Sequence, residues 1–88
     1  MVKAVQLGNI DKVISALNSE EDDSILDVNA KDRQQCTLLH WAAYNNRCEI
    51  AELLINAGAN VNATGGELQE TPIMWCLRRR FYRMAEIL

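Results

Sequence analysis

An internal repeat constrains this sequence more than any other feature. Residues 37–43, Thr-Leu-Leu-His-Trp-Ala-Ala, return as residues 71–77, Thr-Pro-Ile-Met-Trp-Cys-Leu, at an offset of 34 positions. Residues 46–54 return as 80–88 at the same offset, and the pattern occurs a third time in residues 8–17. A period of about 20–50 residues is typical of repeat architectures, in which each unit buries its apolar face against the next one.

The repeat divides a single domain, residues 1–88, into three units. Residues 1–29 form an N-terminal unit with an acidic insertion, residues 30–63 a full unit and residues 64–88 a truncated unit, which makes about two and a half repeats. The insertion contains residues 19–24, Ser-Glu-Glu-Asp-Asp-Ser. A charge run of this kind is expected to form a solvated loop.

Each unit starts with the signals of a short first helix. Thr37 and Thr71 stand at N-cap positions, where a hydroxyl oxygen accepts a hydrogen bond from an unpaired amide of the first turn. Pro72 follows at the first helical position, where its missing N–H has no cost. Ala42 and Ala43 are small, so this helix is expected to lie close to its neighbours.

A second helix, a helix stop and an extended loop complete the unit. Apolar residues in the range 50–54 recur at helical spacing and form a stripe. Gly58 follows, where a left-handed residue closes a helix. Gly65 and Gly66 supply a turn before the next helix pair. The sequence therefore predicts paired antiparallel helices joined by extended finger loops.

The motifs resemble the ankyrin repeat family, whose units repeat at about 33 residues. The fold class is therefore an all-α repeat solenoid. In ankyrin repeats the Thr-x-x-His pair is a hydrogen-bonded structural lock, and the resemblance gives that role to Thr37 and His40. Leu88 ends the sequence inside an apolar helical run with no cap, so we expect the full protein to continue.

A closer resemblance concerns residues 37–47 and 65–72. They are similar to the ankyrin domain of the Asp-His-His-Cys palmitoyltransferases of the huntingtin-interacting kind, as shown by Leu38 in place of the usual Pro, the double Gly and a Trp in both inner helices. In that family a membrane domain transfers palmitoyl groups to protein cysteines, and the cytosolic ankyrin domain holds short linear motifs of substrates and adaptors. The family's groove uses an Asn and a Trp that correspond to Asn45 and Trp75.

The expected binding site is the concave groove formed by the inner helices and the fingers. Its candidate partner-binding residues are Gln34, Trp41, Tyr44, Asn45, Leu68, Trp75, Arg78 and Arg79. The residues expected to have structural roles are Thr37, His40, Gly58, Thr71 and Pro72.

The third unit departs from the family pattern. Met74 replaces the His of the lock, and Arg78, Arg79 and Arg80 stand where a turn ending in Gly is expected. Arg80 lacks the freedom of Gly at positive φ, so the turn is expected to be strained or reshaped. The arginines form either a solvated face or, if they line the groove, a site for an acidic or phosphorylated motif.

Composition argues against other functions. The net charge of −3 does not indicate the basic surface that binds nucleic acid phosphates. No apolar run approaches the ~20 residues of a membrane span. His40 is the only histidine, and the three cysteines lack metal-ligand or disulfide spacing, so we expect no catalysis, metal or cofactor. The expected partner is a protein or peptide segment rather than a small-molecule substrate.

Two functional hypotheses remain. The first is a module that recruits substrates or adaptors to a membrane palmitoyltransferase. The second is an ankyrin adaptor or scaffold in cytosolic signalling with no transferase attached. Both place the segment in the cytoplasm, and the first places it on the cytosolic face of the Golgi or other endomembranes through a membrane domain outside this sequence.

Overall fold

The computed structural model describes residues 2–17 and 28–88, so the acidic run at 19–24 lies outside the described residues. The fold is an all-α repeat solenoid, as the sequence predicts. Its helices are α1 (Val2–Leu7), α2 (Ile10–Leu17), α3 (Leu38–Tyr44), α4 (Cys48–Asn56), α5 (Pro72–Arg78) and α6 (Tyr82–Ile87).

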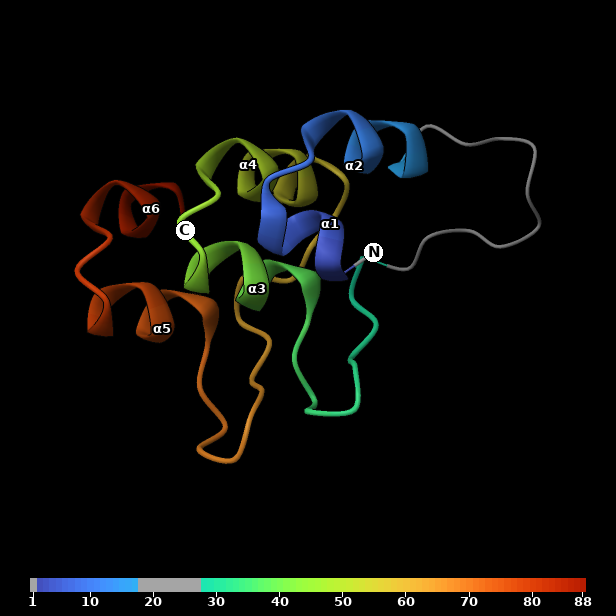
Figure 1. Ribbon diagram of the computed structural model, residues 1–88. Coiled ribbons are helices and arrows are strands. Elements are labelled where there is room, and N and C mark those ends of the chain that lie inside the picture. Colours follow the sequence, from blue (N-terminus) through green and yellow to red (C-terminus); the bar gives the residue numbers. More distant parts are fainter. Residues whose placement is uncertain (1, 18–27) are drawn as a thin grey trace.

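The helices form two layers (Figure 1). Helices α1, α3 and α5 lie side by side in an inner layer, and α2, α4 and α6 form the outer layer above them. Each inner helix packs against the outer helix that follows it in the chain. Two extended segments, residues 28–37 and 57–71, descend on the side away from the outer layer. We call them the first finger and the second finger.

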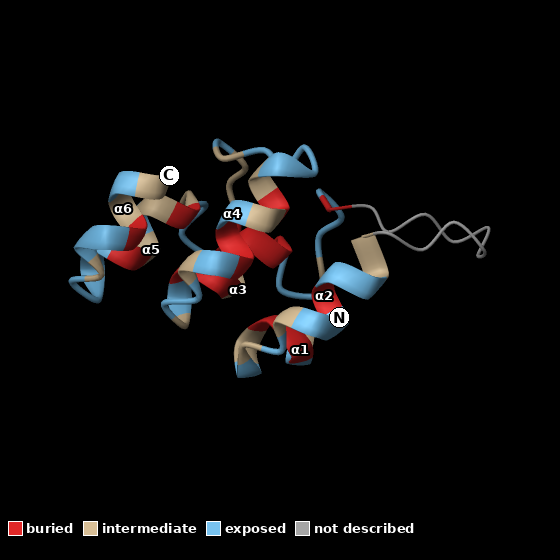
Figure 2. Ribbon diagram, turned by 90° about the horizontal axis from the view of Figure 1, so that it is seen from above, coloured by how far each residue is buried: buried red, intermediate tan, exposed pale blue. Residues whose placement is uncertain are grey.

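The core lies between the layers and between neighbouring repeats (Figure 2). Ala42 and Ala43 of α3 are completely buried, as their small size predicts. Leu39 of α3 and Leu54 of α4 are also completely buried. The middle pair therefore has neighbours on both sides, which is the arrangement that stabilises a stacked repeat.

Residues in the left-handed region recur with the repeat. Gln35 and Gln69 have φ values of 64° and 52° in the two fingers, 34 positions apart. Asn46 and Arg80 have φ values of 57° and 64° in the turns between paired helices. The turn at Arg80 therefore keeps the shape of the turn at Asn46, with a non-glycine residue at positive φ, so of the two expectations the strained turn is found and the reshaped turn is not. Gly58 follows the C-cap Ala57 with φ of 100°, as predicted for a helix stop.

The two fingers are tied together. Gly65 and Glu70 form an antiparallel bridge in the second finger, and the Gly66 amide donates to the Gln34 carbonyl of the first finger at 3.2 Å. A Cβ on Gly65 would lie 2.4 Å from the Gln35 carbonyl oxygen, so only glycine fits there. Nearer the outer layer, the Asn29 side chain bonds both to the Gly58 carbonyl and to the Asn60 amide.

Candidate functional site

The lock between Thr37 and His40 has the predicted geometry. The Thr37 hydroxyl accepts a hydrogen bond from the His40 amide at 3.3 Å, and the His40 ring reaches back to the Thr37 amide at 3.2 Å, which completes a capping box. Both residues are buried. The other ring nitrogen, His40 Nε2, lies 2.7 Å from the Glu70 carbonyl oxygen. The lock therefore joins the second repeat to the second finger.

The hydrogen bonds assign the protonation state of His40. Nδ1 accepts the Thr37 amide, and Nε2 faces a carbonyl oxygen, so the ring is neutral with its proton on Nε2. Burial lowers the pKa of His40, and this outweighs the bond to Glu70. Because both ring nitrogens are engaged, His40 has a structural role. Within the described residues no three His, Cys, Asp or Glu side chains are grouped to hold a metal ion.

Asp32 organises the first finger and one tryptophan. Its carboxylate accepts the Gln34 amide at 2.9 Å, the Cys36 amide at 3.0 Å and the Trp41 Nε1–H at 2.7 Å. Burial acts to raise the pKa of Asp32, but these hydrogen bonds outweigh it and hold the pKa below its usual value. The carboxylate therefore stays charged and fixes the plane of the Trp41 indole.

Three aromatic residues of the inner helices α3 and α5 form a cluster. The Trp75 ring centroid lies 5.9 Å from that of Trp41 and 5.8 Å from that of Tyr44, both with edge-to-face geometry. Trp75 also contacts His40, and the centroids of these two rings are 5.0 Å apart. Such contacts fix the ring positions. The aromatic cluster, defined as Trp41, Tyr44 and Trp75, therefore consists of three rings in mutual contact.

A depression of about 320 Å³ opens beside this cluster, between α3, α5 and the second finger. Trp75 and Tyr44 contribute apolar surface, and Leu68 contributes an exposed side chain from the tip of the finger. The full lining is Tyr44, Gly65, Gly66, Glu67, Leu68, Glu70, Trp75, Arg78 and Arg79. Five of the eight predicted partner-binding residues thus meet at one cavity.

The other three predicted residues lie differently. Gln34 lines a second depression, of about 590 Å³, on the other side of Gly66 and Trp75. Trp41 contacts Tyr44 and Trp75, but its indole N–H is held by Asp32. The Asn45 side-chain amide donates to the Trp41 carbonyl at 2.9 Å. One Asn45 donor is therefore used within the helix, while its Oδ1 accepts nothing from the described residues.

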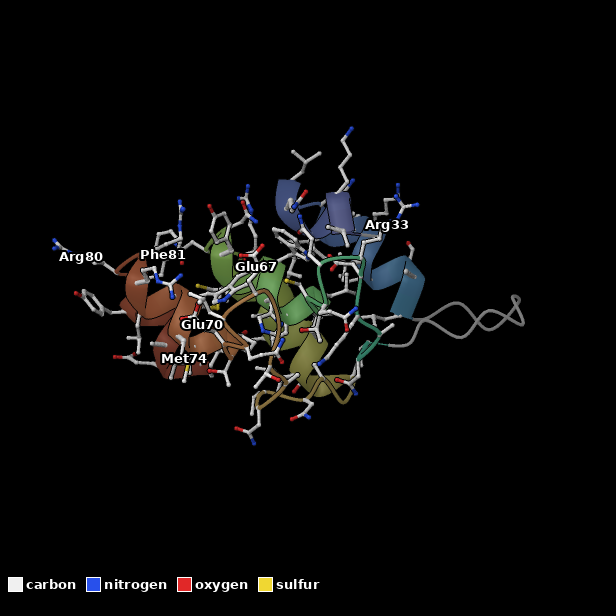
Figure 3. The ribbon with its side chains drawn as sticks, turned by 90° about the horizontal axis from the view of Figure 1, so that it is seen from below. Arg33, Glu67, Glu70, Met74, Arg80 and Phe81 are labelled. Atoms are coloured by element: carbon white, nitrogen blue, oxygen red, sulfur yellow. The ribbon has the colours of Figure 1, made fainter. Side chains whose placement is uncertain are left out.

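The two arginines of the depression differ in their partners. Arg78 forms an ion pair with Glu70 of the second finger. The Arg79 guanidinium lies 4.4 Å from the centroid of the Tyr44 ring and 5.3 Å from that of Phe81. Arg80 points away from Glu67 and Glu70 (Figure 3) and does not line the depression. The arginine run is therefore divided among three environments.

The expectation for Thr71 is only half right. Thr71 is the N-cap of α5 and Pro72 is its first residue, as predicted, but the Thr71 hydroxyl makes no capping bond. Its oxygen is buried without a hydrogen-bond partner. Three residues on, Met74 stands where the second repeat has His40, whose Nδ1 lies 2.9 Å from the Thr37 hydroxyl, so Thr71 lacks that partner.

The cysteines occupy protected positions. Burial raises the pKa of the Cys36 thiol and of the Cys76 thiol, which disfavours the reactive thiolate. Cys48 is partly exposed at the start of α4. Cys36 and Cys76 therefore pack as small apolar residues of the core, whereas Cys48 is only partly buried.

Sequence reasoning missed three acidic residues of the concave face. Glu70 pairs with Arg78, Glu67 lines both depressions, and Asp32 fixes Trp41. Asp32 carried a usable signal, because an aspartate followed by a turn often accepts amides two residues on. The positions of Glu67 and Glu70 depend on how the second finger folds against its neighbour.

The stacked helix pairs, the fingers and the Thr-His lock define an ankyrin solenoid. The family described as ankyrin repeats (3 copies) matches residues 1–88, so the chain belongs to the ankyrin repeat family. The solved structure of a Bdellovibrio bacteriovorus predatory endopeptidase in complex with an immunity protein matches 97% of this chain and 42% of its own chain, with a TM-score of 0.83 and 24% sequence identity. At that identity the match supports the fold alone.

The curated relatives are palmitoyltransferases. Palmitoyltransferase Hip14 of Drosophila melanogaster is 46% identical over 79 residues, which cover 90% of this chain and 12% of that protein. Palmitoyltransferase ZDHHC13 of Mus musculus is 36% identical over 88 residues, which cover 100% of this chain and 13% of that protein. Palmitoyltransferase ZDHHC17 of Rattus norvegicus is 38% identical over 79 residues, 90% of this chain and 12% of that protein. The chain thus spans about an eighth of the relatives it matches.

The region compared is an ankyrin region, and it is a small part of those enzymes. In residues 2–17 and 28–88, none of the helices combines the length and the apolar character that crossing a membrane requires.

Proposed function

We propose that this chain binds a short extended segment of a partner protein in the depression beside Trp75, and that it recruits substrates or adaptors to a palmitoyltransferase. The observation that carries the first part is the meeting of Tyr44, Leu68 and Trp75 around one cavity of about 320 Å³. Trp and Tyr are enriched among the central residues of protein interfaces. Ankyrin repeats typically bind proteins, and the relatives are palmitoyltransferases.

Each side chain has a separate task in this proposal. Trp75 covers an apolar side chain of the segment and excludes water from neighbouring hydrogen bonds. Asn45 offers its free Oδ1 to a peptide amide, while its bond to the Trp41 carbonyl holds the side chain in place. Trp41 acts indirectly in this proposal, because its ring packs against the rings of Trp75 and Tyr44 and holds them in position.

Binding is tested with random linear peptides displayed on phage and selected against the chain. Trp75→Ala should make the free energy of binding of the selected peptides less favourable by about 1–3 kcal/mol. Asn45→Ala should have a smaller effect, because one Asn45 donor is already used. Circular dichroism should show that both variants remain helical. Failure to select any peptide, or full binding by Trp75→Ala, would contradict this site.

Recruitment is tested by competition with the Drosophila relative, which is 46% identical over 79 residues. Excess chain in fly cells should reduce palmitate labelling of that enzyme's protein substrates, and the Trp75→Ala chain should not. Unchanged labelling with the original chain would favour the alternative, an ankyrin adaptor that serves no transferase. We place the segment on the cytosolic side of the membrane that carries the transferase.

A further inference from the structure

The charged residues of the depression are not equivalent. Two glutamates and two arginines line it, but only Arg78 and Glu70 form an ion pair. Glu67 and Arg79 form no ion pair within the part of the chain that the structure describes. A guanidinium without an ion-pair partner therefore lines the depression, beside the apolar surface of Trp75 and Leu68.

Two aromatic rings contact this guanidinium in the absence of a ligand. The Arg79 Cζ atom lies 4.4 Å from the Tyr44 ring centroid and 5.3 Å from the Phe81 ring centroid. A guanidinium stacked on a ring keeps its N–H groups free at the edge of its plane. Because Tyr44 is itself held in the aromatic cluster, the position of Arg79 is coupled to that of Trp75.

We propose that Arg79 receives the carboxylate of an Asp or Glu side chain in the bound segment, next to the apolar side chain that covers Trp75. This inference depends on the proposed peptide site. The planar fork of Arg79 matches the two oxygens of a carboxylate, and its two ring contacts place the guanidinium at the depression.

The surrounding charges favour a carboxylate over a phosphate. A phosphorylated side chain carries a charge of about −1.5 to −2 at neutral pH. The depression offers one unpaired arginine and also the unpaired carboxylate of Glu67, while Arg78 is occupied by Glu70. One negative charge on the segment is matched by Arg79, whereas a second would face Glu67. The neighbouring Arg80 is directed elsewhere (Figure 3).

The test uses the tightest acidic peptide from the phage selection and its uncharged version, with Asp or Glu changed to Asn or Gln. Fluorescence anisotropy gives the Kd of both peptides for the full chain, for Arg79→Gln and for Arg83→Gln. Arg83 is a matched control, because it is exposed on the outer helix α6. Circular dichroism verifies that each variant folds.

We expect Asp or Glu to be enriched at one position of the selected peptides. Arg79→Gln should weaken the acidic peptide by about three- to tenfold, because the rim is solvent-exposed and screened. It should leave the uncharged peptide unchanged, and Arg83→Gln should leave both unchanged. If Arg79→Gln is unfolded, the two peptides compared on the original chain test the same ion pair, with the acidic peptide binding about three- to tenfold more tightly at low salt.

The outcomes separate this inference from the proposed site. Peptides whose binding depends on Trp75 but is unaffected by Arg79→Gln would overturn the role of Arg79 and leave the site intact. Tighter binding of a phosphoserine version than of the aspartate version would overturn the preference for a carboxylate. If no peptide is selected, that result contradicts both the proposed peptide site and the proposed role of Arg79.

Discussion

The second and third repeats start their inner helices with the same residue and support them differently. Thr37 and Thr71 are both N-caps, 34 positions apart. Thr37 is bonded to His40, whose ring continues to the Glu70 carbonyl. The Thr71 hydroxyl is buried without a partner, and Met74 is exposed.

The difference separates stability from binding. The lock of the second repeat extends to the second finger through the bond from His40 to the Glu70 carbonyl. One histidine side chain therefore bonds to residues of two repeats. The third repeat has no such lock among its described residues, yet its inner helix carries Trp75 and Arg78 at the depression, and the C-cap residue Arg79 follows them. We infer that the second repeat supplies the lock, and that the third supplies most of the ligand contacts, beside Tyr44 and Asn45 of the second repeat.

The largest effect on stability is expected at the seam between the two fingers, where Gly65 contacts Gln35. Gly65→Ala would place a Cβ 2.4 Å from the Gln35 carbonyl oxygen and 3.1 Å from the His40 ring. Since a backbone atom cannot move aside cheaply, the variant should lose about 2–4 kcal/mol of unfolding free energy in urea titrations. Gly58→Ala is the control, because nothing lies within 4 Å there and only its φ of 100° resists a side chain. It should lose about 1 kcal/mol. Equal losses would show that the seam is not tight.

The lock itself should make stability depend on pH. Burial lowers the pKa of His40 in the folded chain, so near its ordinary pKa of about 6.5 the unfolded chain binds a proton that the folded chain does not. The free energy of unfolding therefore has its full value above that pH and decreases as the pH is lowered, with a slope of at most about 1.4 kcal/mol per pH unit.

This dependence is measurable by urea unfolding between about pH 7 and about pH 5, above the range in which ordinary carboxylates titrate. The chain has one histidine, so His40→Gln should remove the dependence while being less stable at neutral pH. A persisting slope in His40→Gln would assign it to another group.

Sequence reasoning succeeded where the signal is local. The helix pairs, the lock at Thr37 and His40, and the stop at Gly58 each depend on residues a few positions apart. The contact between His40 and Glu70 spans 30 positions and needs the folded second finger. The ion pair between Glu70 and Arg78 depends on the same placement, so the charge balance of the depression was not predictable.

One wrong expectation concerns a local signal. Thr71 matches the N-cap pattern, which predicts a side-chain cap, although Met74 departs from the lock three residues on. In the second repeat His40 Nδ1 lies within hydrogen-bond distance of both the Thr37 amide and the Thr37 hydroxyl. Met74 offers no such nitrogen, and the Thr71 hydroxyl has no hydrogen-bond partner.

A smaller effect sharpens the comparison of the two threonines. Thr37→Val removes bonds to the His40 amide and to His40 Nδ1 and should cost about 1–2 kcal/mol. Thr71→Val removes a buried hydroxyl that has no partner, so it should change stability by less than about 0.5 kcal/mol or increase it. Paired urea titrations measure both. A loss at Thr71 as large as that at Thr37 would mean that its hydroxyl does cap α5.

The smallest effect concerns the turns that join the paired helices. Asn46 and Arg80 occupy the same position of the repeat with φ values of 57° and 64°. Asn tolerates this region better than Arg, because its short side chain bonds the local backbone. Arg80→Gly should therefore raise the unfolding free energy by about 0.5–1 kcal/mol, and Asn46→Gly should change it little. Arg80 is exposed and directed outward (Figure 3), so its loss removes little packing. Destabilisation by Arg80→Gly in urea titrations would show that the arginine side chain contributes more than its backbone costs.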